Sequence, residues 1–176
     1  MRHKNINKVT HQWLAKRIQA SDILVDATAG NGHDTVFLAS LGKHVFAFDV
    51  SELAYQRTKE KIMHLDNVTL IHDSHTQIKK YITTPIDGVM FNCGYLPQSD
   101  HSSVTEATTT LLALDHLRDL LAKDGWICIT VYTGHSQGEI EAIEVKSWLD
   151  RHAKIIRSYT YEGVNNTPIA YLATLA

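Results

Sequence analysis

Short runs of apolar residues recur along the chain, separated by stretches with apolar residues at helical spacing. Such short runs predict buried strands, and an i, i+3, i+4 pattern predicts amphipathic helices. The predicted strands are residues 23–28, 44–50, 68–73, 86–93, 126–133, 154–162 and 168–176. The predicted helices are residues 5–20, 33–42, 51–64, 76–82, 103–122 and 137–150. Each of the first three strands carries an aspartate at or near its carboxyl end.

Strands that alternate with helices predict an α/β fold, with a mostly parallel seven-stranded sheet and helices on both faces. The last two strands are separated only by a short loop, GVNNT, so we expect them to pair as an antiparallel hairpin. No linker, repeat or low-complexity tract interrupts the chain, and we therefore expect a single domain over residues 1–176.

Composition narrows the possible classes of protein. The chain has 176 residues, of which 44% are hydrophobic and 20% charged, as in ordinary globular proteins. No apolar run is long enough for a membrane span, and the N-terminus lacks the apolar core of a secretory signal.

Cys93 and Cys128 lie in predicted strands, which favours buried thiols in a reducing cytoplasm and no metal site. The formal net charge of -2 is unlike that of a strongly basic nucleic-acid binder.

A glycine-containing turn after the first strand is the clearest candidate for a ligand site. The segment Asp26-Ala-Thr-Ala-Gly30-Asn31-Gly32 joins this strand to a helix, and glycines let a backbone turn sharply beside a ligand. Asp49 ends the second strand, where a carboxylate can accept both hydroxyls of a ribose. The two features together predict a site for an adenosine-type ligand.

The acidic residues of the turn favour S-adenosylmethionine (SAM) over a dinucleotide. Thr35 stands where a dinucleotide fold has its third glycine, and Asp34 would repel a phosphate. Asp26 suits a ligand that carries an ammonium and a sulfonium, although Asp26 and Asp34 could instead only cap the turn. Asp73 would lie near the adenine, or be a solvated acid at a strand end. The predicted cofactor-binding residues are Asp26, Thr28, Gly30, Asn31, Gly32, Asp34, Thr35, Asp49, Asp73 and Asn92.

The fourth strand ends in Asn92-Cys93-Gly94-Tyr95-Leu96-Pro97, which should face the same crevice. The Asn92 amide oxygen can accept a hydrogen bond from an attacking amine, and Tyr95 can stack on a base or cover the sulfonium. The segment resembles the Asn-Pro-Pro-Tyr loop of amino-group methyltransferases, with Cys93-Gly94 in place of the prolines. Weaker candidates for proton removal or base contact are Asp100, His101, Tyr132 and His135.

Three stretches carry a resemblance to one bacterial family: DATAGNGHDTVFLA, FNCGYLPQSDHSSVT and VYTGHSQGEIEA. They resemble the MnmM-type tRNA methyltransferases, which were first labelled rRNA methylases. The resemblance implies a Rossmann-like class I SAM methyltransferase fold, with S-adenosyl-L-methionine as the cofactor. It also implies that the chain methylates the 5-aminomethyl group of a wobble (2-thio)uridine in the tRNA anticodon loop.

A tRNA substrate requires local basic surfaces, because the net charge is slightly negative. Residues 1–21 contain Arg2, Lys4, Lys8, Lys16 and Arg17 and no acid before Asp22, and this segment is the first candidate surface. Arg151, Lys154 and Arg157 form a second. A homodimer would complete the RNA groove, and light scattering that shows a fully active monomer would exclude it.

Several other activities stay open on the sequence alone. The acceptor of the methyl group could instead be rRNA, a protein amide or a small-molecule amine. An NAD-dependent dehydrogenase is disfavoured by Thr35 and the acidic turn. A SAM-binding but inactive partner subunit is disfavoured by the intact segment from Asn92 to Tyr95.

Overall fold

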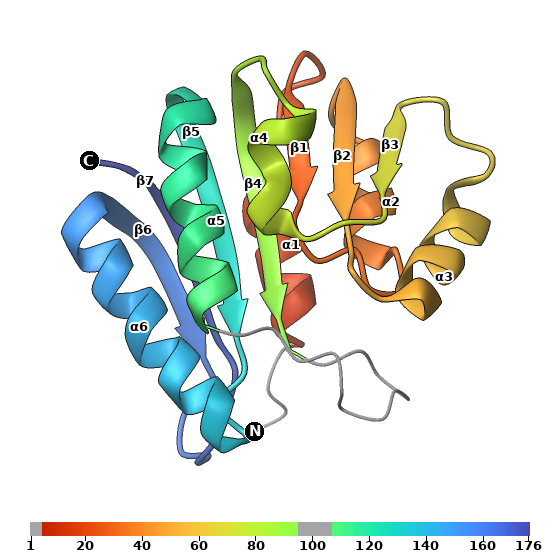
Figure 1. The fold of residues 1–176 in the computed structure, drawn as a ribbon. Coiled ribbons are helices and arrows are strands. Elements are labelled where there is room, and N and C mark those ends of the chain that lie inside the picture. Colours follow the sequence, from red (N-terminus) through yellow and green to blue (C-terminus); the bar gives the residue numbers. More distant parts are fainter. Residues whose placement is uncertain (1–4, 95–106) are drawn as a thin grey trace.

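The computed structural model describes residues 5–94 and 107–176. Seven strands form one sheet in the order β3-β2-β1-β4-β5-β7-β6 (Figure 1). The strands are β1 (Ile23–Asp26), β2 (His44–Phe48), β3 (Val68–Ile71), β4 (Ile86–Cys93), β5 (Leu121–Val131), β6 (Ala153–Thr160) and β7 (Ile169–Leu175). The helices are α1 (Ile6–Leu14), α2 (His33–Ala39), α3 (Glu52–Ile62), η1 (His75–Gln77), α4 (Ile78–Tyr81), α5 (Ala107–Leu120) and α6 (Ser136–His152).

The pairing of the strands confirms the predicted α/β sheet. Strands β1 to β5 are parallel to their neighbours in this set, whereas β7 is antiparallel to both β5 and β6. In the closing hairpin, β7 therefore lies between β5 and β6, and β6 is the edge strand. Strand β6 runs in the same direction as β5. As a result, β1 to β6 all end at one edge of the sheet, here called the carboxyl edge.

Alternate residues of the central strands feed two separate apolar cores. In β4, Val89 and Phe91 join the cluster covered by α4, α5 and α6, whereas Met90 joins the opposite cluster with Leu14 of α1 and Leu38 of α2. This alternation is the period of a strand whose two faces are both buried. Figure 1 shows α5 and α6 in front of the sheet and α1 behind it. No helix in the described part of the chain is long and apolar enough to cross a membrane.

Some predicted boundaries were wrong. The first helix ends at Leu14, well before residue 20, because the chain then turns so that Ile18 packs against the second core. Strand β5 begins at Leu121, which pairs with Ile86 of β4, although the preceding helix was predicted to extend to residue 122 and the strand to begin at residue 126. The register shifts before Gly88 pairs with Trp126, so β5 contains an irregularity that the apolar pattern does not reveal.

A buried carboxyl group joins α5 to α6 beneath the end of β4. Glu141 is 1% exposed, and its Oε1 accepts a hydrogen bond from the Thr110 hydroxyl at 2.7 Å. Burial raises the pKa of Glu141 to about 7. The nearby Cys93 thiol is also buried, and burial raises its pKa well above the usual value. The expected buried thiols are confirmed, since Cys128 is buried and free as well.

The buried carboxyl predicts a specific pH dependence of stability. Because the folded pKa of Glu141 is raised from 4.5 to about 7, its contribution to stability is full below about pH 4.5 and is lost as the pH rises towards 7. Glu141→Gln, which is always neutral, should gain up to about 3 kcal/mol relative to the wild type between pH 4.5 and 8. Urea unfolding of both proteins at a series of pH values measures this. A pH-independent difference would contradict it.

Candidate active site

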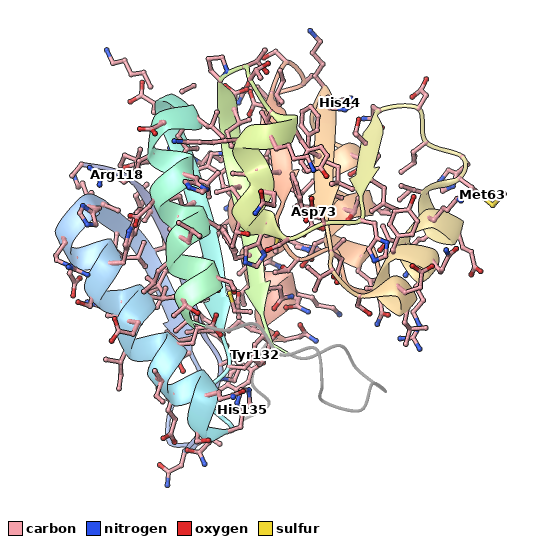
Figure 2. The ribbon with its side chains drawn as sticks, in the orientation of Figure 1. His44, Met63, Asp73, Arg118, Tyr132 and His135 are labelled. Atoms are coloured by element: carbon pink, nitrogen blue, oxygen red, sulfur yellow. The ribbon has the colours of Figure 1, made fainter. Side chains whose placement is uncertain are left out.

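The polar residues that end the strands collect along the carboxyl edge of the sheet. Asp26 ends β1, Asp49 follows β2, Asp73 follows β3, Asn92 lies near the end of β4 and Tyr132 follows β5. Parallel strands bring their ends to one edge, so positions remote in sequence become neighbours in space. Figure 2 shows Tyr132 and His135 at this edge, where β5 ends and α6 begins.

The turn after β1 depends on glycine at two positions. Gly30 has a φ of 56° and Gly32 a φ of 76°, which are left-handed values that favour glycine. The Gly30 amide donates to Asp49 Oδ2 at 2.8 Å, which ties the turn to the end of β2. Asn31 accepts from the Arg57 guanidinium at 3.1 Å. The predicted turn residues Gly30, Asn31 and Gly32 thus form one tightly held loop beside Asp49.

Asp26 is an internal support of this turn. Its side chain is fully buried, Oδ1 accepts from the Thr28 amide at 3.1 Å, and Oδ2 accepts from the Thr35 hydroxyl at 2.6 Å. Burial, followed by the negative charge of Asp34, raises the pKa of Asp26 to about 7. The capping role considered for Asp26 is therefore present in the structure. Direct contact between Asp26 and a cofactor stays a prediction.

Asn92 is the junction between β4 and the turn. Its backbone amide donates to Thr28 Oγ1 at 2.7 Å, and its Nδ2 lies 3.2 Å from Asp34 Oδ2 and 3.4 Å from Asn7 Oδ1. The amide oxygen of Asn92 is buried and has no hydrogen-bond partner among the described residues. A buried acceptor without a donor is costly, so this atom is an apparent binding point for a ligand donor.

Asp49 and Asp73 differ in how much of their hydrogen-bonding capacity the protein itself uses. Asp49 is half-buried and accepts one backbone amide at each oxygen, from Gly30 and from Ser51 at 2.9 Å. Each carboxylate oxygen keeps a second lone pair, so Asp49 can still accept two hydroxyls. Asp73 accepts from the Tyr81 hydroxyl at 2.7 Å, and this hydrogen bond is the main cause of its lowered pKa. Asp73 is therefore a fixed carboxylate beside α4.

Two of the weaker catalytic candidates, Tyr132 and His135, lie within the described residues, and Tyr132 forms a side-chain hydrogen bond with Asn92. His135 caps α6, since its Nδ1 accepts from the Gly138 amide at 3.0 Å. The Gly138 backbone lies so close to Tyr132 that a Cβ there would stand 1.9 Å from the Tyr132 carbonyl oxygen. Burial raises the pKa of Tyr132 to about 12, which argues against proton removal by this phenol. The candidates Tyr95, Asp100 and His101 lie outside the described residues.

Three residues of the site were not identified from the sequence. Asn7 and His11 lie four residues apart on α1 and both face the turn, His11 through Nε2 at 2.7 Å from Asp34 Oδ1. Their i, i+4 spacing on an otherwise apolar helix face was the available signal. His75 has its Nδ1 2.9 Å from the Ala27 carbonyl oxygen, and burial lowers its pKa. Its Nε2 is buried without a partner among the described residues.

These groups fit a cationic adenosine-type ligand. Asp49 has lone pairs left for a ribose, and the Asn92 amide oxygen and His75 Nε2 are buried acceptors that receive no hydrogen bond from the described part of the chain. Asp34 and Asp49 both act electrostatically on Asp26, so acidic side chains are concentrated around the glycine turn. A phosphate would be repelled there, whereas a sulfonium and an ammonium would be attracted. In the described part of the chain, no three His, Cys, Asp or Glu side chains are grouped so as to hold a metal ion.

The chain resembles known methylases over most of its length. Residues 45–174 match the family model described as "Putative rRNA methylase". A crystal structure from Clostridium thermocellum with the same description is 36% identical, has a TM-score of 0.91, and covers 100% of both chains. A methyltransferase-like structure from Streptococcus mutans, in complex with S-adenosylhomocysteine (SAH), is 35% identical with a TM-score of 0.88. That match covers 99% of this chain and 100% of the other.

A curated plant protein is also similar. The chloroplastic tRNA (mnm(5)s(2)U34)-methyltransferase of Arabidopsis thaliana is 31% identical over 163 residues, which covers 80% of this chain. The match spans 58% of the length of the plant protein.

The position of Asp49 predicts the effect of its removal on cofactor binding. Asp49→Ala should weaken SAH binding by about 100-fold or more, because two charge-assisted hydrogen bonds to the ribose are lost and the turn loses its anchor. Isothermal titration calorimetry with SAH measures the affinity, and Asp66→Ala, which removes an exposed carboxylate far along the chain from the turn, is the matched control. Equal affinity of wild type and Asp49→Ala would place the ribose elsewhere.

Proposed function

The chain belongs to the rRNA-methylase family that its sequence matches, and we propose that it N-methylates 5-aminomethyl-(2-thio)uridine at the wobble position of tRNA. The predicted family and the predicted dependence on S-adenosyl-L-methionine are confirmed by the comparisons. The observation that carries the proposal is the buried amide oxygen of Asn92 at the carboxyl edge, which has no hydrogen-bond partner within residues 5–94 and 107–176. An acceptor at this place suits an amine that must present its lone pair to the cofactor.

The reaction is a displacement in which the amine nitrogen forms a bond to the methyl carbon. The bound cofactor supplies a methyl group activated by its sulfonium, and the C–S bond breaks with its electron pair going to sulfur. The nitrogen then carries a positive charge and releases one proton to water. The products are the secondary amine, SAH and a proton. Because the methyl group is already activated, the protein contributes mainly by positioning the amine.

The amine must be neutral when it attacks, because an ammonium has no lone pair. A free alkylamine has a pKa of about 10.4, as lysine has, and burial in the crevice lowers such a value. A hydrogen bond from the amine N–H to Asn92 Oδ1 would orient the remaining lone pair. Asn92 accepts this proton only as a hydrogen bond and is no base. The residues around Asn92 therefore serve to position the amine, and none of them has to take up its proton.

We favour the wobble uridine as the substrate because the chain is similar to the plant tRNA methyltransferase. The description of the family model names rRNA instead. Both are RNA, and the same Asn92 acceptor would serve an amine or amide in rRNA, a protein or a small molecule. A SAM-binding partner subunit without activity is a further possible outcome. The cytoplasmic location and the homodimer stay predictions, the latter open to light scattering.

A direct experiment separates these substrates. Purified chain is incubated with SAM and with tRNA that carries 5-aminomethyluridine, and the nucleosides are examined by mass spectrometry. We expect conversion to 5-methylaminomethyluridine, and a loss of about 100-fold in rate for Asn92→Ala measured at saturating SAM. An unchanged tRNA together with methylated rRNA or a methylated metabolite would overturn the tRNA proposal. Full turnover by Asn92→Ala would overturn the role of Asn92.

The structure divides the predicted basic surface of the N-terminal segment. Asn7, next to the exposed Lys8, reaches the site at the carboxyl edge, whereas Arg17 donates to the Asp124 carbonyl oxygen at the other end of the sheet. Arg2 and Lys4 lie outside the described residues. In the second predicted surface, Arg151 and Lys154 lie where α6 ends and β6 begins, far from the carboxyl edge. Of the described residues in these two predicted surfaces, Lys8 is therefore the one best placed to contact the anticodon loop.

This arrangement predicts different effects for two lysines of the same segment. Lys8→Ala should weaken tRNA binding and reduce the slope of log affinity against log salt by about 1, because one phosphate contact is lost. Lys16→Ala, the matched control beside Arg17, should leave both unchanged. Filter binding or fluorescence anisotropy over a range of salt concentrations measures the slopes. An equal effect of the two substitutions would indicate that tRNA lies along the whole helix.

A further inference from the structure

A chain of side-chain contacts connects the N-terminal helix to the junction residue of the site. His11 Nε2 of α1 lies 2.7 Å from Asp34 Oδ1 of α2, and Asp34 Oδ2 lies 3.2 Å from Nδ2 of Asn92 in β4. The Asp34 side chain is 9% exposed and that of His11 is 26% exposed. Two polar contacts that share Asp34 thus connect α1, α2 and β4, which come from distant parts of the sequence.

These contacts determine which end of the Asn92 amide faces which way. An ionised carboxylate is only an acceptor, so Asp34 must face the Asn92 NH₂ group and not its oxygen. The oxygen of Asn7, at 3.4 Å, favours the same orientation. With its NH₂ group held, the amide directs Oδ1 to the other side, where this atom has no hydrogen-bond partner among the residues that the structure describes. Rotation by half a turn would place two oxygens against each other.

His11 in turn holds the carboxylate. Its ring is stacked on Phe37 of α2, with the centroids 3.8 Å apart and the planes at 3°. The stacking keeps Nε2 directed at Asp34, and each Asp34 oxygen then has one partner. The first turn of α1 is anchored as well, since the Ile6 amide donates to the Tyr161 hydroxyl at 3.1 Å. The helix therefore presents His11 from a fixed position.

We propose that His11 and Asp34 are positioning residues for methyl transfer, which hold the Asn92 amide with its oxygen towards the amine. This rests on the proposed function, because it assumes that Asn92 Oδ1 receives the amine hydrogen bond. Neither residue needs to exchange a proton with the substrate. Helix α1 thereby contributes a positioning residue, His11, in addition to packing against the sheet.

The kinetic test uses variants that separate the hydrogen bond from the packing. His11→Phe keeps a flat ring on Phe37 but removes the donor, and it should lower kcat about 10-fold with unchanged SAH affinity. Asp34→Ala should lower kcat about 100-fold. In the Asn92→Ala background, His11→Phe should cost less than about 2-fold more, because the group it positions is absent. The controls His64→Phe and Asp66→Ala change exposed residues and should match the wild type.

A second measurement does not depend on activity. In ¹⁵N-labelled protein, the side-chain NH₂ signal assigned to Asn92 by its loss in Asn92→Ala should exchange slowly with water. In His11→Phe it should shift and exchange at least about 10-fold faster, whereas His64→Phe should not change it. If this holds but the wild type methylates no 5-aminomethyluridine, the proposed function fails and the positioning stands. Fast exchange in the wild type, or an undiminished cost of His11→Phe in the Asn92→Ala background, would overturn the positioning.

Discussion

The buried Asp26 carboxylate is the contact on which the site depends. It holds Thr28 and Thr35, so it fixes the exit of β1, the entry to α2 and the glycine turn between them. Thr28 then accepts the backbone amide of Asn92, which connects the turn to β4. A carboxyl group enclosed in this way needs its hydrogen-bond donors, because burial without them is costly. The Asp26 side chain thereby holds the glycine turn in a fixed position relative to the end of β4.

Histidines supply much of the remaining order around the site. His11 holds Asp34, His75 binds the Ala27 carbonyl, His116 lies 2.9 Å from the Thr76 carbonyl oxygen, and His135 caps α6. The unusual number of eleven histidines thus has a partial explanation. Three of these rings, those of His75, His116 and His135, contact backbone groups in turns or short helical segments, where main-chain donors and acceptors lack regular partners.

The fold was largely predictable because its signals are local. Apolar runs such as residues 86–93 and the glycine turn identify their own positions, and the parallel order brings Asp49 and Asn92 to one edge. The features that could not be predicted from the sequence depend on contacts between residues that lie far apart along the chain. The start of β5 at Leu121 depends on pairing with Ile86, and the burial of Asp26 depends on α2. The roles of Asn7 and His11 were missed because an amphipathic pattern does not say which polar side chain meets a carboxylate across the core.

The crowding of Asp34 and Asp49 around Asp26 has a consequence for turnover. With SAM bound beside the glycine turn, as we propose, the positive charge of its sulfonium would offset the repulsion between these acids before the transfer. After the transfer the sulfur is a neutral thioether, so part of that compensation disappears. The same three aspartates would therefore bind SAH less tightly than SAM. This difference in affinity between the sulfonium of SAM and the thioether of SAH would reduce product inhibition without a conformational change.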